Sequence, residues 1–253
     1  MRFTRKYFAS LFIVIITLSC NSLDSGPEAV WLFASTEGEG KKDTLLNAAS
    51  FLNLQKDGSY SRDFGFYDYG KWAIEQNELI LNSARMSKVR IPIKKQGKNE
   101  LQLSASAELL VNFVRTPAAD NEANPFVPEH NQWRLAAQKH ENTAELRNRL
   151  LNHCRFWELY FSWGLHNNIN ALDVRNTPTP IKIYANGFGL KKYNDLPQSW
   201  KRYFYDSTNC KQASDMLISV FSRHKIKWPE TDSKYEMFIS AFQQLQQHLK
   251  EIE

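Results

Sequence analysis

The first half of the chain alternates short apolar segments with polar turns, at intervals of roughly ten residues, which is typical of antiparallel strands joined by hairpins. Asp57-Gly58 is a strong hairpin signal, and Gln76-Asn77 predicts a second tight turn. Eight such strands can close on themselves and leave no exposed edge. The pattern predicts strands at 30–35, 50–55, 59–64, 70–75, 78–82, 88–93, 100–104 and 108–114.

In the second half the apolar positions recur at three- and four-residue steps, which indicates helices. Asn142 followed by Glu145 matches a capping box, and the apolar face behind it holds Leu146, Leu150, Cys154, Trp157 and Phe161. The stretch 157–163 is apolar nearly all round, which predicts a central, buried helix. Further helices are expected after Pro197, with Trp200, Tyr203 and Phe204, then around 213–221, and at 235–252.

Two other segments of the second half are not helical in pattern. Asn186-Gly187 lies between two short apolar runs and predicts a β-hairpin over 181–193. The segment 118–128 contains two prolines and little periodicity, so it is expected to be a linker. The fold class is therefore α+β: an eight-stranded antiparallel barrel or meander over 29–117, the linker, and a mainly helical domain over 129–253 with one β-hairpin.

The N-terminus has the layout of a secretory signal: a basic start with Arg2, Arg5 and Lys6, then an apolar run over 8–18. That run is short for a bilayer span, which needs about 20 apolar residues. Thr17-Leu18-Ser19-Cys20 resembles the lipobox of bacterial lipoproteins, although Leu18 stands two positions before the cysteine instead of three.

The lipobox resemblance implies that residues 1–19 are removed as a signal peptide and that Cys20 is lipidated, with palmitate among its acyl chains. Acyl chains on one residue anchor a protein stably when at least two are present. Residues 20–28 would then be a polar tether to a membrane of the cell envelope. Asn21 is not acidic, so it lacks the feature that resembles an inner-membrane retention signal, and this favours the outer membrane with the domains in the periplasm. The alternative is ordinary signal cleavage with a coincidental cysteine.

A second resemblance concerns the strand-rich half. Lys56-Asp57-Gly58-Ser59-Tyr60, Tyr69-Gly70-Lys71-Trp72 and Asn77-Glu78-Leu79-Ile80-Leu81 together resemble the bacterial lipocalin-like domains, in which such motifs recur on consecutive hairpins after an early tryptophan. The resemblance covers about 90 residues and implies a small hydrophobic ligand or none. The candidate ligand-binding residues are Trp31, Tyr60 and Trp72. The alternative is that inward side chains fill the barrel.

The net charge of the chain bears on one class of partner, nucleic acid. The chain has 32 basic and 27 acidic residues, and three of the basic ones lie in the signal, which leaves 29 against 27. A nearly neutral surface gives no electrostatic reason to expect nucleic acid as a partner. The 7 Trp, 10 Tyr and 16 Phe residues promise a large buried area instead.

The sequence contains few candidate catalytic or metal-binding residues. Cys154 and Cys210 either pair in an oxidising compartment or are small buried thiols. No cysteine or histidine spacing typical of zinc occurs, and no nucleophile motif, so neither a metal nor a cofactor is expected. One polar cluster follows the buried helix and either faces a cleft or ends that helix: His166, Asn168, Asp173 and Arg175.

These observations favour a non-catalytic binding or scaffolding protein on an envelope membrane. Its partner would be a small hydrophobic ligand or another envelope protein. The alternative is an envelope hydrolase with its site in the helical domain or between the domains.

Overall fold

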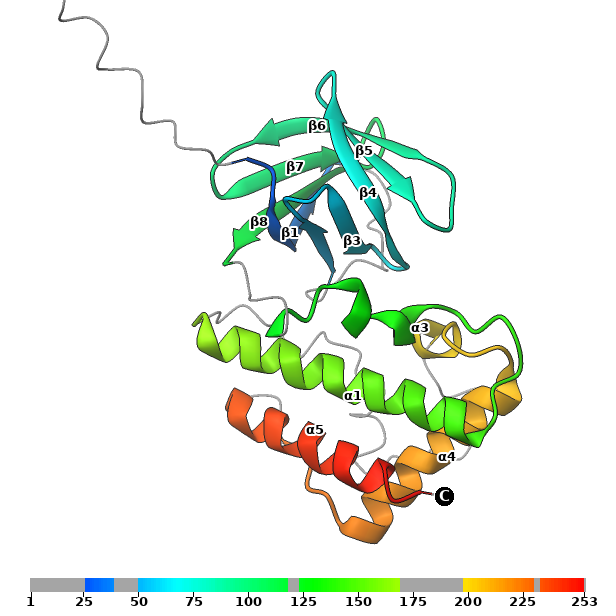
Figure 1. Cartoon of the computed structure of the whole chain (residues 1–253). Coiled ribbons are helices and arrows are strands. Elements are labelled where there is room, and N and C mark those ends of the chain that lie inside the picture. Colours follow the sequence, from blue (N-terminus) through cyan, green and yellow to red (C-terminus); the bar gives the residue numbers. More distant parts are fainter. Residues whose placement is uncertain (1–25, 39–49, 118–122, 169–197, 230–232, 253) are drawn as a thin grey trace, which may run out of the picture.

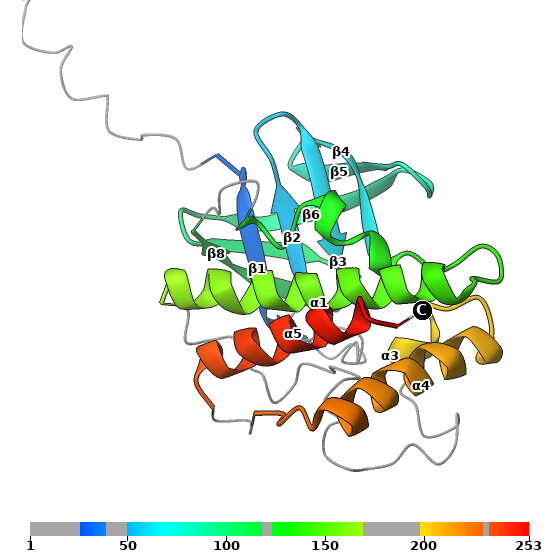
Figure 2. The same ribbon diagram turned by 60° about the horizontal axis from the view of Figure 1, so that its bottom comes forward.

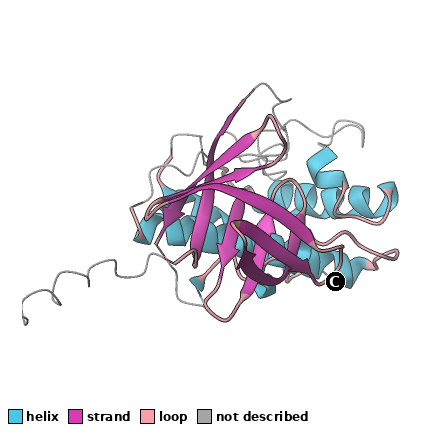
Figure 3. Cartoon of the chain, turned by 90° about the horizontal axis from the view of Figure 1, so that it is seen from above, coloured by secondary structure: helices cyan, strands magenta, loops and turns pink. Residues whose placement is uncertain are grey.

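A closed β-barrel packs on a layer of helices. The computed structural model describes residues 26–38, 50–117, 123–168, 198–229 and 233–252. The barrel lies on one side of the longest helix, α1 (Thr143–His166), and α4 (Ser207–His224) and α5 (Tyr235–Leu249) lie on the other side (Figure 1). Figure 3 shows the same arrangement from above, with the strands crossing over the helices. The chain is of the α+β class, as its pattern predicted.

All eight predicted strands are present, and each pairs antiparallel with its neighbour in sequence. The first strand also pairs with the last, from Val30 opposite Thr116 to Glu37 opposite Leu110, which closes the barrel. The strands are β1 (Ala29–Glu37), β2 (Phe51–Leu54), β3 (Ser59–Asp63), β4 (Tyr67–Glu75), β5 (Glu78–Ser83), β6 (Val89–Gln96), β7 (Glu100–Ser104) and β8 (Leu110–Thr116).

The two predicted hairpin turns have the backbone conformations that their residues favour. Gly58 has a φ of +76° in the β2–β3 hairpin, where Oδ1 of Asp57 accepts the backbone N–H of Ser59 at 2.8 Å. Gln76 and Asn77 both have positive φ, at 50° and 66°, which is the backbone of a type I′ hairpin. Both turns follow from local sequence alone.

The barrel encloses its own core. Eleven buried residues fill it: Trp31, Leu52, Leu54, Tyr60, Leu79, Leu81, Ile93, Leu101, Leu103, Val111 and Phe113. In a strand, alternate residues point to opposite faces, so the outward residues of β1, β2 and β4 form a second apolar surface. Val30, Leu32, Phe51 and Tyr67 on that surface belong to the core shared with the helices. All four residues of β2 are buried because both of its faces are covered.

The helical layer is organised around one long, central helix. Its bounds and those of the others are α1 (Thr143–His166), α3 (Gln198–Lys201), α4 (Ser207–His224) and α5 (Tyr235–Leu249), with short 3-10 helices η2 (Pro128–His130) and η3 (Gln132–Arg134) before α1. α5 runs beside α1, and α4 crosses near their ends (Figure 2). The capping box is confirmed: Oδ1 of Asn142 accepts the N–H of Glu145, and Oε2 of Glu145 accepts the N–H of Asn142.

Specific polar contacts join the barrel to the helices. Arg134 of η3 forms a buried ion pair with Asp63 of β3. The hydroxyl of Ser61 donates to the carbonyl of Phe126, whose ring lies 4.9 Å from those of Phe51 and Trp163. The described end of the predicted linker, residues 123–128, is thus packed between the barrel and α1.

The structure corrects one helix prediction, leaves one hairpin prediction outside the described residues and decides between the alternatives for two cysteines. The short helix after Pro197 ends at Lys201, and Tyr203 and Phe204 are buried beyond it. The β-hairpin expected over 181–193 lies outside the described residues. Cys154 and Cys210 are both buried and free, so the second of the two alternatives for these cysteines holds in this structure. In the described part of the chain, no helix has the length and hydropathy that a membrane span needs.

Candidate ligand-binding site

A cavity of about 280 Å³ opens at one end of the barrel. It lies where β3, β6, β7 and β8 reach the loops that join β3 to β4, β5 to β6 and β7 to β8. Its lining is largely apolar, with two arginines: Arg62, Phe64, Phe66, Val89, Arg90, Ile91, Leu103, Ser104, Ala105, Val111 and Phe113. A concave, mostly apolar site with few polar groups is the usual form of a small-molecule site.

Arg62 is the buried cation of this cavity. Tyr60 and Arg62 of β3 and Phe64, the residue after β3, stand at alternate positions, so all three point into the barrel. Only 5% of the Arg62 side chain is exposed. Its guanidinium carbon lies 5.4 Å from the ring centre of Phe64 and 5.0 Å from that of Phe66, within cation–π range. The arginine is therefore held between aromatic rings at the cavity wall.

Asp68 partly balances the charge of Arg62. One oxygen of Asp68 lies 3.4 Å from Nη2 of Arg62, which is a long contact for a charged pair. Asp68 also accepts the hydroxyls of Tyr60 and Ser83, both at 2.6 Å. The carboxylate is thus well satisfied by neutral donors, whereas Nε of Arg62 is buried with no hydrogen-bond partner.

This arrangement also fixes the state of Tyr60. Burial, followed by the hydrogen bond to Asp68, raises the pKa of Tyr60 above its ordinary value. The phenol therefore stays protonated and donates to Asp68 at neutral pH. Nε of Arg62 is a donor that the carboxylate does not engage.

None of the three aromatic residues expected to bind ligand lines this cavity: Trp31 and Tyr60 belong to the barrel core, and Trp72 is half-buried against it. Trp31 is fully buried, and its indole N–H donates to the carbonyl of Pro27. The indole N–H of Trp72 donates to the carbonyl of Gln55, at the end of the barrel away from the cavity. Tyr60 reaches the cavity only through Asp68 and Arg62. Their positions match the alternative in which inward aromatic residues fill the barrel.

The polar cluster after the buried helix is only partly described. His166 is the last residue of α1, and Asn168 follows it with a φ of +52°, and both are exposed. Asp173 and Arg175 lie outside the described residues, as does Cys20. The two described residues, His166 and Asn168, lie at the end of α1, which agrees with the alternative in which the cluster ends the buried helix.

Two groups of candidate functional residues were not anticipated from sequence. The sequence could have indicated Arg62, because it stands at an inward-facing position of the predicted strand, between the inward-facing aromatic residues Tyr60 and Phe64. A second group, His224, His248 and Glu251, gathers at the ends of α4 and α5. Its only sequence signal is the three-residue spacing of His248 and Glu251, which places them on one side of a helical turn.

Comparison of the chain with protein-family models, with curated proteins and with solved structures found no match.

Proposed function

We propose that this chain is a lipid-anchored protein of a bacterial cell envelope whose barrel, of the lipocalin-like kind, binds a small amphipathic anion. The ligand has an apolar body and one negatively charged group. The observation that carries the proposal is Arg62, a buried arginine with an unpartnered Nε at the wall of a largely apolar cavity. The proposal is for binding and involves no catalytic step.

The cavity limits the ligand. Its volume of about 280 Å³ is just below the usual range for ligand pockets, roughly 300 to 1,000 Å³, so the ligand must be small. Most of the wall is aliphatic or aromatic, so transfer of each methylene from water contributes about 0.8 kcal/mol. A medium-chain carboxylate fits both the size and the chemistry, with its head near Arg62 and its chain among the side chains of Val89, Leu103 and Val111.

The two arginines of the cavity differ in a way that allows a matched comparison. Arg90 lies at the rim, half exposed, and pairs with Glu75 and Glu78 at 3.1 Å each. An exposed cation with two carboxylate partners is screened by water and contributes little to binding. Arg62 is desolvated and only weakly paired, so an anionic ligand would gain more from it.

Calorimetric titration with octanoate, 1-octanol and octylamine tests the charge preference. We expect octanoate to bind best and octylamine worst. Shortening the acid to hexanoate should weaken binding about tenfold, from the loss of two methylenes. Arg62→Met keeps an unbranched apolar stem and should remove the preference for octanoate over octanol, whereas Arg90→Met should retain it. Equal affinity of the wild type for acid and alcohol, or loss of the preference in both variants, would contradict the proposal.

The anchor needs its own test because it rests on residues outside the described part. Mass spectrometry of the N-terminal peptide from membrane-extracted protein should show Cys20 as the first residue with acyl groups attached. Cys20→Ala should release the protein from the membrane fraction. An unmodified peptide, or one that begins before Cys20, would refute the anchor without affecting the binding proposal.

A further inference from the structure

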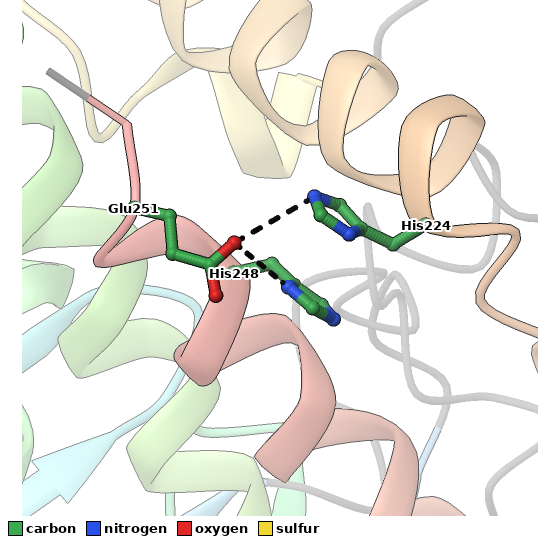
Figure 4. A group of neighbouring side chains, drawn as sticks. All are labelled: His224, His248 and Glu251. Atoms are coloured by element: carbon green, nitrogen blue, oxygen red, sulfur yellow. Dashed lines mark hydrogen bonds and ion pairs between the residues drawn. The ribbon is translucent and has the colours of Figure 1, made fainter.

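Three potential metal ligands meet where α4 and α5 end, on the helical side of the molecule and away from the barrel cavity. Figure 4 shows His224 from the last turn of α4 facing His248 from the last turn of α5 and Glu251 just after that helix. Oε2 of Glu251 lies 3.9 Å from Nε2 of His224 and 3.1 Å from Nδ1 of His248. One ligand atom from each residue lies within 4.8 Å of the other two. We propose that these three residues bind one zinc-like transition-metal ion.

The donor set favours this class of ion. Two imidazole nitrogens and one carboxylate oxygen suit Zn²⁺ and its neighbours Co²⁺, Ni²⁺ and Cu²⁺, whereas Mg²⁺ and Ca²⁺ prefer oxygen ligands throughout. Three protein ligands leave the fourth tetrahedral position to water. The site is therefore an open His₂Glu site on the surface.

The geometry requires only side-chain adjustment. Ligand atoms around tetrahedral zinc at 2.0–2.1 Å are about 3.3 Å apart, so the present separations need to shrink by at most about 1.5 Å. The side chains of His224, His248 and Glu251 are 31%, 20% and 54% exposed, so they have room to rotate. Because the two rings are nearly parallel, with centres 3.5 Å apart, one imidazole must turn so that its lone pair points to the shared ion.

A histidine coordinates a metal ion through its neutral imidazole ring. A bound ion would join the end of α4 to the end of α5, two elements that are distant in sequence and meet through packing.

Zinc titration of the tag-free mature chain, treated first with chelator, tests the proposal. We expect one Zn²⁺ per chain by calorimetry and no binding of Mg²⁺. At a hundredfold excess of Zn²⁺ over its dissociation constant, the melting temperature should rise by about 5 to 10 °C. Co²⁺ should give the visible absorption of a four-coordinate nitrogen and oxygen site, a readout that a structural role of the histidines alone would not produce.

Variants separate this site from other histidines. His224→Gln and His248→Gln should each weaken Zn²⁺ binding by at least tenfold, since even indirect partners of a metal contribute tenfold or more. His166→Gln is the matched control, because His166 also stands exposed in the last turn of a helix, α1, and it should bind as the wild type does. Far-UV circular dichroism of each apo variant verifies that it is folded. Absence of stoichiometric binding, or binding that survives both substitutions together, would overturn the proposal.

Discussion

His153 offers the sharpest test of how the helical core is packed. It lies on α1, is 1% exposed, and neither ring nitrogen has a hydrogen-bond partner. The ring packs edge-on against Trp133, with centres 4.4 Å apart, and lies 5.2 Å from Trp200. Burial, and to a smaller degree the charge of Arg134, lowers the pKa of His153 from 6.5 to about 3.

The sign of the effect on stability follows from where the proton binds. Below pH 6.5 the unfolded chain protonates this histidine while the folded chain keeps it neutral, so the free energy of unfolding falls as the pH falls, until about pH 3. The slope is about 1.4 kcal/mol per pH unit, so the loss at pH 5 is about 2 kcal/mol. This is a large fraction of a typical folding stability of about 5 to 15 kcal/mol.

His153→Phe removes the titrating group and both unpartnered nitrogens while keeping an aromatic ring. Urea unfolding followed by tryptophan fluorescence, at several pH values from 7.5 to 4.5, gives the stability of each protein. When the pH is lowered from 7.5 to 5, we expect the free energy of unfolding of the variant to rise by about 2 kcal/mol relative to that of the wild type. Carboxylates titrate in both proteins and cancel in the difference. His166→Gln, at an exposed position, should keep the wild-type pH dependence. A difference between His153→Phe and wild type that stays constant with pH would refute the reasoning.

Three further predictions concern a helix cap, a buried ion pair and a close contact between strands, and each is measured by urea unfolding. Asn142→Ala removes the cap of α1 and should lower the free energy of unfolding by about 1 kcal/mol, while Asn142→Asp should retain most of it. Arg134→Met leaves the buried carboxylate of Asp63 unpaired and should lower stability by about 3 to 5 kcal/mol, and adding Asp63→Leu should restore much of the loss. Gly70→Ala places a Cβ 2.1 Å from the carbonyl oxygen of Asn82 on β5, so it should lower stability by about 1 to 3 kcal/mol and increase amide exchange in β4 and β5. Any of these substitutions with no measurable effect would contradict the contact that it tests.

Local sequence determined the elements of this protein and their turns. The alternation of apolar residues predicted eight strands, and their observed bounds differ from the predicted ones by only a few residues. The glycine of Asp57-Gly58, the pair Gln76-Asn77 and the capping box of Asn142 and Glu145 act over two to four residues, so their chemistry is readable without the fold. A buried central helix was also evident, because Glu158 and Ser162 are the only polar residues over 157–163.

Tertiary structure decided whatever depends on which segments meet. Closure of the barrel rests on pairing between β1 and β8, which are about 80 residues apart, and the strand pattern alone fits an open meander equally well. Only the closed barrel places Arg62 on a cavity wall, whereas the residues expected from the sequence to bind ligand, Trp31, Tyr60 and Trp72, do not line that cavity. His224 and His248 meet only because α4 packs beside α5. Alternation and capping are properties of neighbouring residues, whereas a cavity or a ligand cluster depends on long-range packing that no short window of sequence contains.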